Sequence, residues 1–585
     1  MKVGFINSIV TGKLDSFPIG LTSLCTVLRD KGIYSKIIDF ARLSSREITL
    51  ERAFSERNIE KCAKLICKEQ FSVISFYTMA NSYHITLKIA EKVKEIDPDC
   101  VIILAGPQAS VCGEETLRYF SFIDLVALGE GEQTIYEIVK NAHKRMFDNC
   151  PNALIRQGND IIRTRVVKPL DDLDKLPFLD YSYVPYVNAF KTFPIEVGRG
   201  CPFQCKFCST KGFWNQQYRL KSSSRIVQEI KYVQERFGIK KFSFEHDSLT
   251  ANRKRIIEFC NHLISSGLDI TWGCSSRVDV LDDEIIMLLS KAGCCSIFLG
   301  IESGSPTIQK KINKNLNLDR IIPTIRILKQ HNIEVTCSFI YGFPDETECD
   351  ISKTLALISN LITIGVEHIQ IHRLTILRGT EYYEQCKCLL NSINTDGNFN
   401  AGGNGKQFET FIKNYPTIFP HFYSIDGVLE DSTYIECFVN NILKLLTKHF
   451  PNTYRVIIDR YKADMYHIYQ DMILCCKKME VETYNTLNGL LANQLMEDKL
   501  ISMLSDCFFK SKWVNDSFMN ELFRFESDYL LWFRRQDGSF EKTYGYDLYE
   551  FIAGGIEMNP NPQKTQLSVT IQNNHVYLQR QVVCE

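Results

Sequence analysis

Three cysteines, Cys201, Cys205 and Cys208, stand at the spacing C-x3-C-x2-C. Their thiolates can hold three irons of a [4Fe–4S] cluster, because such clusters are bound through cysteine sulfur. The fourth iron is then left without a protein ligand and can take a small chelating molecule. The apolar run at residues 193–197 predicts a strand just before the cysteines. The cysteines therefore lie on the loop after a strand, where α/β barrels build their active sites.

A structural zinc site is the alternative for these thiols. Structural zinc takes four ligands, usually arranged in two pairs. No second pair of cysteine or histidine residues follows closely, and the next histidine is His246. This spacing favours the iron–sulfur cluster.

Six strands separated by helices are predicted around and after the cysteines. Six such βα units make a partial barrel that is open on one side, which suits a substrate larger than a metabolite. The predicted strands are residues 193–197, 241–244, 270–274, 296–299, 334–340 and 368–373. Among the predicted helices are residues 224–236, 253–266 and 319–330.

The cysteine spacing, with the aromatic Phe207 before the last cysteine, resembles the radical S-adenosylmethionine (SAM) superfamily. In that family the amino and carboxylate groups of SAM chelate the fourth iron. One electron then cleaves SAM to a 5′-deoxyadenosyl radical. The resemblance therefore implies an electron donor such as flavodoxin or ferredoxin.

The resemblance also implies SAM-binding roles for residues at the ends of the barrel strands. Phe207 is expected to contact the adenine of SAM. Glu245 and Asp247, in the sequence FSFEHD, stand where the family binds the SAM amino group, although the family often has two glycines and a glutamate there. Arg277 is expected to bind the SAM carboxylate, because its planar fork of donors suits a carboxylate. His246 is expected to be a core or loop histidine.

Four further residues complete the implied SAM site. Glu302 and Ser303, in the sequence FLGIESGS, match the segment that binds the ribose. Lys314 stands at the family's usual place for a basic residue, and Gly342 begins the turn on the adenine side. Two alternatives stay open: Arg277 and Lys314 are surface charges, or Glu302 caps a helix.

Before Cys150, short apolar strands alternate with helices. This alternation predicts a doubly wound, Rossmann-like parallel sheet. Ligands of such sheets bind beyond the carboxyl ends of the strands. The candidate binding loops are residues 8–16, 77–82, 106–110 and 129–134.

The sequences PIGLTSLCTVLRDKG, AGPQAS and GEGEQT resemble the cobalamin-binding domain that precedes many radical SAM domains. The motif D-x-H-x-x-G, which supplies a histidine ligand to cobalt, is absent, so cobalamin is expected without a protein histidine on the metal. Gln108 stands where family members often carry a histidine. The implied cobalamin-binding residues are Ser8, Thr78, Gly106, Gln108, Gly129, Gly131 and Glu132.

Two alternatives remain for this first domain. The sheet can recognise substrate or dock the barrel without a cofactor. It can also hold a second cluster, as in methylthiotransferases, which use three cysteines there. However, Cys25 and Cys67 fall on apolar helix faces, where buried free cysteine is common, and the loop at residues 8–11 has no cysteine.

Composition narrows the class of protein and its setting. The chain of 585 residues has a formal net charge of −1, so nucleic acid is not an expected partner. Its 22 cysteines are scattered along the chain, whereas disulfide frameworks belong to small secreted domains. We therefore expect a reducing cytoplasm. No apolar run reaches the length needed to span a membrane, so no membrane partner is expected.

We expect a cobalamin-binding domain at residues 1–150, a linker at 151–189, a radical SAM barrel at 190–385 and a mainly helical domain at 386–585. Residues 391–406, rich in Asn and Gly, are expected to be a linker or mobile loop. The last domain is expected to cover the open barrel and contribute to the substrate pocket, since closure excludes water. It also contains predicted helices at 433–446, 453–477 and 483–505, and a hairpin around Asn573 and Asn574.

The resemblance implies C-methylation of an unactivated carbon in a natural-product or ribosomal-peptide precursor. In that chemistry the radical removes a hydrogen and methylcobalamin delivers the methyl group. Two alternatives are radical cyclisation or rearrangement without methyl transfer, and a corrinoid-binding sensor or docking protein without catalysis. The intact cysteine triad argues against the last.

Overall fold

The computed structural model describes residues 1–7, 17–40, 56–366, 368–393 and 406–425, and short stretches between residues 435 and 582. The chain divides into two compact units. The first contains residues 1–302, 309–344 and 372–427. The second contains residues 303–308, 345–371 and 428–585. Each is described by itself.

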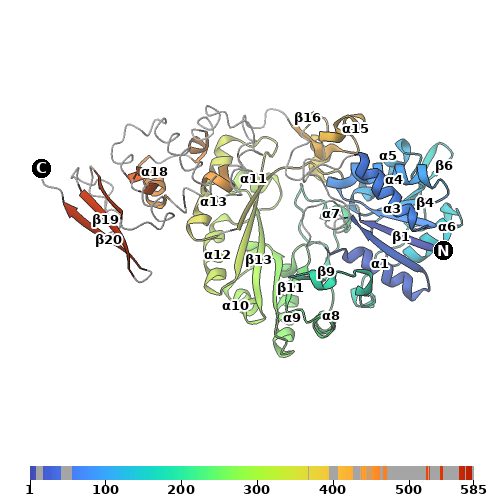
Figure 1. Cartoon of the computed structure of the whole chain (residues 1–585), viewed down its shortest axis with the longest axis horizontal. Helices are drawn as coiled ribbons and strands as arrows, with labels where there is room; N and C mark the ends of the chain where they lie inside the picture. Colours follow the sequence, from blue (N-terminus) through green and yellow to red (C-terminus); the bar gives the residue numbers. More distant parts are fainter. Residues whose placement is uncertain are drawn as a thin grey trace. The chain divides into compact units, whose positions relative to one another are not determined.

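The N-terminal sheet begins with five parallel strands, with helices on both of its faces (Figure 1). Successive strand residues point to opposite faces, so Ile102 and Leu104 enter one core and Val101 and Ile103 the other. The strands are β1 (Lys2–Asn7), β2 (Tyr34–Asp39), β3 (Val73–Tyr77), β4 (Val101–Ala105) and β5 (Leu125–Ala127). The helices are α1 (Ile19–Asp30), α3 (Glu56–Lys68), α4 (Tyr83–Ile96), α5 (Pro107–Tyr119) and α6 (Ile135–His143). The predicted doubly wound sheet is confirmed.

A hairpin extends this sheet beyond the predicted boundary at residue 150. Strands β6 (Ala153–Gln157) and β7 (Asp160–Arg163) add antiparallel to β5, giving the order β2-β1-β3-β4-β5-β6-β7. Arg156 fixes the hairpin, because its guanidinium donates to the carbonyl oxygens of Leu117, Phe120 and Ile123 around the end of α5. The expected linker at 151–189 therefore begins as part of the first sheet.

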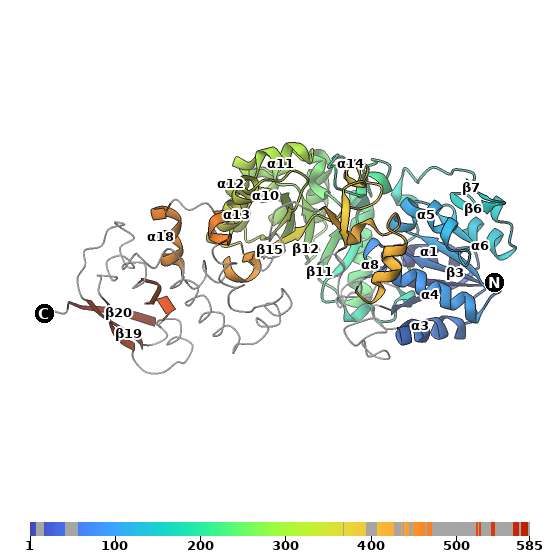
Figure 2. The same ribbon diagram turned by 90° about the horizontal axis from the view of Figure 1, so that it is seen from above.

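The six predicted barrel strands are confirmed, and they form one sheet in chain order, β8-β11-β12-β13-β14-β15. Helices follow each other along the outside of the sheet (Figure 2). The strands are β8 (Phe193–Glu196), β11 (Lys241–Glu245), β12 (Thr271–Ser276), β13 (Cys294–Glu302), β14 (Glu334–Tyr341) and β15 (His368–Arg373). The helices include α8 (Ser223–Phe237), α9 (Arg253–Ser265), α10 (Asp283–Lys291) and α12 (Ile321–Gln330), whereas α13 (Glu348–Thr363) belongs to the second unit.

Short polar side chains start several of these helices. Ser222, Asn252 and Asp282 each accept a hydrogen bond from a backbone N–H in the first turn of α8, α9 and α10. Such caps satisfy donors that the helix itself leaves unpaired. These caps fix where each helix begins after the loop that follows a strand.

The described residues 390–393 and 406–425 return to the N-terminal domain instead of starting a separate one. Strand β16 (Leu390–Ile393) pairs antiparallel with β17 (Tyr423–Ile425), and helix α15 (Glu409–Asn414) lies between them in sequence. Apolar side chains of this segment belong to the same core as α3, α4 and α5: Phe408, Ile412, Ile418, Phe419 and Phe422. Two expectations are corrected here. Residues 391–393 are strand, not linker, and the described part of the segment after residue 386 packs on the first sheet domain; residues 394–405 lie outside the described residues.

The last described stretches belong to the second unit. Helix α18 (Pro451–Tyr461) matches the start of the predicted helix 453–477, while the predicted helix 483–505 lies outside the described residues. The predicted hairpin is confirmed as β19 (Thr565–Gln572) and β20 (His575–Val582), and an unpredicted strand, β18 (Phe540–Tyr544), pairs with β19. In the described part of the chain, we find no helix long and apolar enough to cross a bilayer.

Candidate active site

A cavity of about 770 Å³ lies in the first unit, between the N-terminal sheet and the barrel. One wall comes from the loops after β3, β4 and β5 and from the start of α1. The opposite wall comes from the loop after β8 and the ends of the next barrel strands. The carboxyl ends of both parallel sheets therefore face one space, as expected for ligand sites in such sheets.

All three cysteines of the C-x3-C-x2-C sequence line this cavity. Cys201, Cys205 and Cys208 are partly exposed and form no disulfide. Burial raises the pKa of the Cys201 thiol to about 11 and also raises the pKa of Cys205, an effect that nearby Lys314 opposes. Burial therefore disfavours the thiolate forms of Cys201 and Cys205, and the positive charge of a bound cluster would stabilise them.

The cysteine loop depends on a close backbone approach at Gly200. Its φ is +86°, and a Cβ there would lie 1.8 Å from the carbonyl oxygen of Gln217. The loop is held in this position by the antiparallel pairing of β9 (Gly198–Arg199) with β10 (Arg219–Leu220). Only glycine fits such a position, which explains its place directly before Cys201.

No group of three His, Cys, Asp or Glu side chains in the described ranges could hold a single metal ion. The three cysteines therefore do not converge as the ligands of a closed zinc site must. A [4Fe–4S] cluster has a different requirement, because each cysteine binds a separate iron. The finding therefore speaks against a single zinc ion at these cysteines and leaves the cluster open.

Glu245 and Asp247, at the end of β11, line the cavity with no ion-pair partner in the described part of the chain. Glu245 accepts a hydrogen bond from Ser243 Oγ (2.7 Å), and Asp247 accepts one from Thr210 Oγ1 (3.2 Å). Burial raises the pKa of both carboxyl groups. Two carboxylates without a cation suit a ligand that brings its own positive charge.

Arg277 and Lys314 are only 7% and 8% exposed, so the alternative that they are surface charges is wrong. Arg277 donates to Asp279 and to the carbonyl oxygen of Lys314 (2.8 Å), and its guanidinium lies 3.9 Å from the centre of the Phe203 ring. Lys314 Nζ lies 2.6 Å from Glu302 Oε1. Arg277, Glu302 and Lys314 all line the cavity that the cysteines line.

Of the other implied SAM residues, Phe207 lines the cavity, whereas Ser303 and Gly342 are not among its lining residues. The Ser303 hydroxyl lies 3.0 Å from Thr354 Oγ1, within the second unit. The sequence resemblance placed both residues by position along the chain. Chain position did not show which residues reach the cavity.

The opposite wall contains Gly106, Gly129, Gly131 and Glu132 of the implied cobalamin set. A Cβ on Gly131 would lie 3.0 Å from the Leu24 side chain, and one on Gly129 would meet open space. Side chains of α1 and α6 complete an apolar floor, which sequence reasoning missed: Leu21, Leu24, Ile135 and Ile138. A wide, glycine-edged apolar wall fits a large flat cofactor.

Thr78 and Gln108 are not among the residues that line the cavity, and their cobalamin-binding role stays a prediction. The Thr78 hydroxyl donates to the carbonyl oxygen of Ala105 (2.8 Å) and accepts from the N–H of Ala109. The Gln108 side chain donates to the carbonyl oxygen of Ile418 (3.2 Å). Both residues hold the start of α5 in place. Ser8 lies outside the described residues.

His246 is the one histidine among the described residues that line the cavity, and it lies on the barrel wall. Its Nδ1 accepts a hydrogen bond from the N–H of Ser248 (2.9 Å), so the neutral ring carries its proton on Nε2. Burial lowers its pKa to about 4. Among its described lining residues, the glycine-edged wall contains no histidine.

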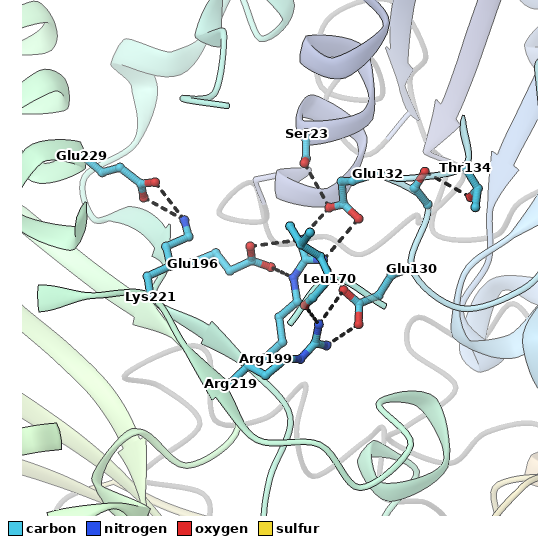
Figure 3. Close-up of polar contacts among 11 residues, drawn as sticks. Ser23, Glu130, Glu132, Thr134, Leu170, Glu196, Arg199, Arg219, Lys221 and Glu229 are labelled. Atoms are coloured by element: carbon cyan, nitrogen blue, oxygen red, sulfur yellow. Dashed lines mark hydrogen bonds and ion pairs between the residues drawn. The ribbon is translucent and has the colours of Figure 1, made fainter. Parts of the chain in front are cut away.

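A buried cluster of charges joins the two walls (Figure 3). We call it the junction cluster. Its members are Glu130, Glu132, Glu196, Arg199 and Arg219. Arg199 carries most of the contacts, and Ser23 Oγ of α1 donates to Glu132 (3.0 Å). Glu132 is therefore engaged by Arg199 and Ser23 instead of being free for a cofactor. Sequence reasoning missed this contact, because Glu130 and Arg199 are 69 positions apart in the chain.

Comparison with known proteins adds two family matches. Residues 8–139 match the B12 binding domain, and residues 195–358 match the radical SAM superfamily. The first match covers β2 to β5 and the loops that form the glycine-edged wall. The second begins in β8 and covers the cysteine loop.

Two curated relatives span much of this chain. An uncharacterized methyltransferase of Pyrococcus horikoshii is 28% identical over 373 residues, which is 63% of this chain and 78% of the relative. An anaerobic magnesium-protoporphyrin IX monomethyl ester cyclase of Rubrivivax gelatinosus is 32% identical over 283 residues, which is 46% of this chain and 50% of the relative. The chain thus spans only half the length of the cyclase.

Among solved structures, the fold is similar to that of OxsB, a cobalamin-dependent SAM radical enzyme solved with aqua-cobalamin and SAM bound. The TM-score is 0.58 at 15% sequence identity, and the likeness covers 95% of this chain and 82% of OxsB. At this identity the likeness concerns the fold alone.

Proposed function

The chain belongs to the cobalamin-dependent radical SAM enzymes, and we propose that it transfers a methyl group to an unactivated carbon of a natural-product or ribosomal-peptide precursor. Its cofactors are a [4Fe–4S] cluster, SAM and cobalamin. One observation carries the proposal: a single cavity is lined by the three cysteines and by the glycine loops of the B12 binding domain. A substrate in that space is within reach of both cofactor sites.

The residues of the barrel wall would hold the cluster and SAM. Cys201, Cys205 and Cys208 would bind the cluster, and the unpaired carboxylates of Glu245 and Asp247 would attract the ammonium group of SAM. The paired cations nearby, Arg277 and Lys314, are buried and can exchange a protein carboxylate for that of SAM.

The glycine-edged wall would hold the corrin. Gly106, Gly129 and Gly131 leave room for close backbone approach, and the apolar side chains of α1 and α6 exclude water from beneath it. When bound, the cluster with SAM supplies a carbon radical and the corrin supplies a methyl group; the protein positions both and shields them from solvent.

Radical cyclisation without net methyl transfer is the second candidate function. It is favoured by the 32% identity to a protein named as a cyclase, whereas methyl transfer is favoured by a relative named as a methyltransferase that is matched over 78% of its length. The longer match decides the order of the two candidates.

The test follows the fate of SAM, so it does not require the unidentified substrate. The full chain is reconstituted anaerobically with iron, sulfide and hydroxocobalamin and is given SAM and titanium(III) citrate. About four irons per chain are expected. We expect both 5′-deoxyadenosine, from reductive cleavage, and S-adenosylhomocysteine, from methyl transfer to the corrin.

The matched control replaces Cys201, Cys205 and Cys208 with alanine, which should abolish the cluster and 5′-deoxyadenosine formation. Formation of 5′-deoxyadenosine without S-adenosylhomocysteine favours cyclisation. Neither product, with both cofactors bound, favours a corrinoid-binding protein. Undiminished SAM cleavage by the triple variant rules out the assigned cluster site.

A further inference from the structure

Arg199 is the centre of the junction cluster, and its side chain is 5% exposed (Figure 3). Its Nε donates to Glu196 (3.0 Å), its Nη1 to Glu130 (2.6 Å) and its Nη2 to Glu132 (2.6 Å). Further contacts from Nη1 to Glu132 and from Nη2 to Glu196 use both arms of the guanidinium twice. One planar fork therefore holds three carboxylates.

The three carboxylates come from two different domains. Glu130 and Glu132 lie on the loop after β5, where they alternate with the cavity-lining Gly129 and Gly131. Glu196 ends β8, and Arg199 itself stands two residues before Cys201. Arg199 thus links the loop of the glycine-edged wall directly to the segment that carries the cysteines.

We propose that Arg199 is a positioning residue that fixes the glycine loop against the cysteine loop, and thereby fixes the corrin relative to the cluster. The proposal rests on the proposed function only in assuming that both cofactors serve one cavity. The competing role is that of an ion pair that stabilises the fold as a whole and sets no distance between the two loops.

Charge balance explains why the junction cluster is sensitive to the loss of Arg199. The junction cluster has three glutamates and two arginines. Without Arg199, Glu130 keeps its ion pair with Arg219, but Glu132 and Glu196 lose their arginine while buried at the domain boundary. Buried carboxylates without a partner draw in water or protons, so the two loops are expected to separate.

Three variants separate positioning from general stability. Arg199→Gln removes the charge, and Arg199→Lys keeps it but lacks the planar fork that reaches three carboxylates. Arg165→Gln is the matched control. Arg165 binds Glu137 in the same sheet domain, but both side chains are about half exposed.

The first measurement is pulsed electron paramagnetic resonance on the full chain loaded with cluster and cobalamin, both reduced to paramagnetic states. The distribution of dipolar couplings between cluster and cobalt should be narrow in the wild type and in Arg165→Gln. This distribution should be at least two-fold broader in Arg199→Gln and of intermediate width in Arg199→Lys. An unchanged coupling in Arg199→Gln, with both cofactors bound, overturns the proposal.

A second measurement covers the case in which Arg199→Gln takes up too little cofactor. Hydrogen exchange of the cofactor-free full chain should rise at least ten-fold in residues 128–134 and 197–209 together, with α9 unchanged. A similar rise throughout the barrel, α9 included, supports general stability and overturns positioning. Neither measurement depends on methyl transfer, so failure of the proposal is distinguishable from failure of the proposed function.

Discussion

At the scale of single residues, Gly200 is the most constrained position of the cysteine loop. A residue with a side chain would have to adopt a left-handed backbone conformation there, at a cost of about 1–2 kcal/mol. Its Cβ would also lie 1.8 Å from the carbonyl oxygen of Gln217. We expect Gly200→Ala to lower the iron content of the reconstituted chain well below that of the wild type.

Gly238 provides the control for this change. It ends α8 with a φ of +67°, and a Cβ there would meet nothing within 4 Å. Gly238→Ala should cost about 1 kcal/mol, from the backbone conformation alone, and leave the iron content unchanged. Normal iron content in Gly200→Ala would show that the cysteine loop can shift away from Gln217.

At the scale of elements, two buried histidines report on the packing of residues 406–425 against α4. Burial, together with the nearby His421, lowers the pKa of His84 to about 3, and burial lowers the pKa of His421 to about 3. Both nitrogens of His84 are buried without a hydrogen-bond partner. The unfolded chain takes up protons near pH 6.5, but the folded chain does so only near pH 3. Stability is therefore lost as pH falls below 6.5.

From pH 7 to pH 5 each histidine should cost the fold about 2 kcal/mol. Hydrogen exchange in α4 and residues 406–425 should show this loss. His84→Leu should remove about half of this loss of stability, since the variant lacks one of the two buried rings. His143→Leu, on an exposed face of α6, should leave the loss unchanged. An exchange rate independent of pH in the wild type, after correction for intrinsic exchange, would contradict the buried neutral pair.

Only some of the helices and strands could be predicted from the sequence. Several barrel strands were recognisable because a short apolar run is followed by a helix with a polar cap, as at Asp282 before α10. The hairpin β6–β7 was missed, although Gly158 at its turn is a local signal. The return of residues 406–425 to the first sheet was not predictable, because no local pattern encodes which distant core an apolar segment joins.

At the scale of the whole molecule, only part of the cavity lining could be predicted from the sequence. The three cysteines were assigned from their spacing, and the glycines of the opposite wall from their loops. The junction cluster was not, because Glu130 and Arg199 are 69 positions apart and only the fold brings them together. The engagement of Gln108 by Ile418, 310 positions away, could not be predicted for the same reason.

The final prediction concerns where the chain can be cut. Truncation after Leu389 removes Phe408, Ile412 and Phe419 from the core that also contains α4 and α5. It also removes Thr417, whose carbonyl oxygen accepts from Arg378, the residue that also donates to the carbonyl oxygen of Val111 in α5. Because α5 begins at the cavity wall, loss of this segment should loosen the cobalamin side while sparing the cysteine loop.

Truncation after Gly427 is the matched comparison, because it removes the same last residues but keeps the packed segment within the first unit. Both shortened chains lack 428–585, so any shared loss of solubility cancels. We expect the chain ending at Gly427 to retain about one hydroxocobalamin through gel filtration and the chain ending at Leu389 to retain little, with iron content similar in both. Equal corrin retention would show that residues 390–427 are dispensable for the glycine-edged wall. Substrate modification by the chain ending at Gly427 would in turn show that the expected cover over the barrel is not supplied by the last residues.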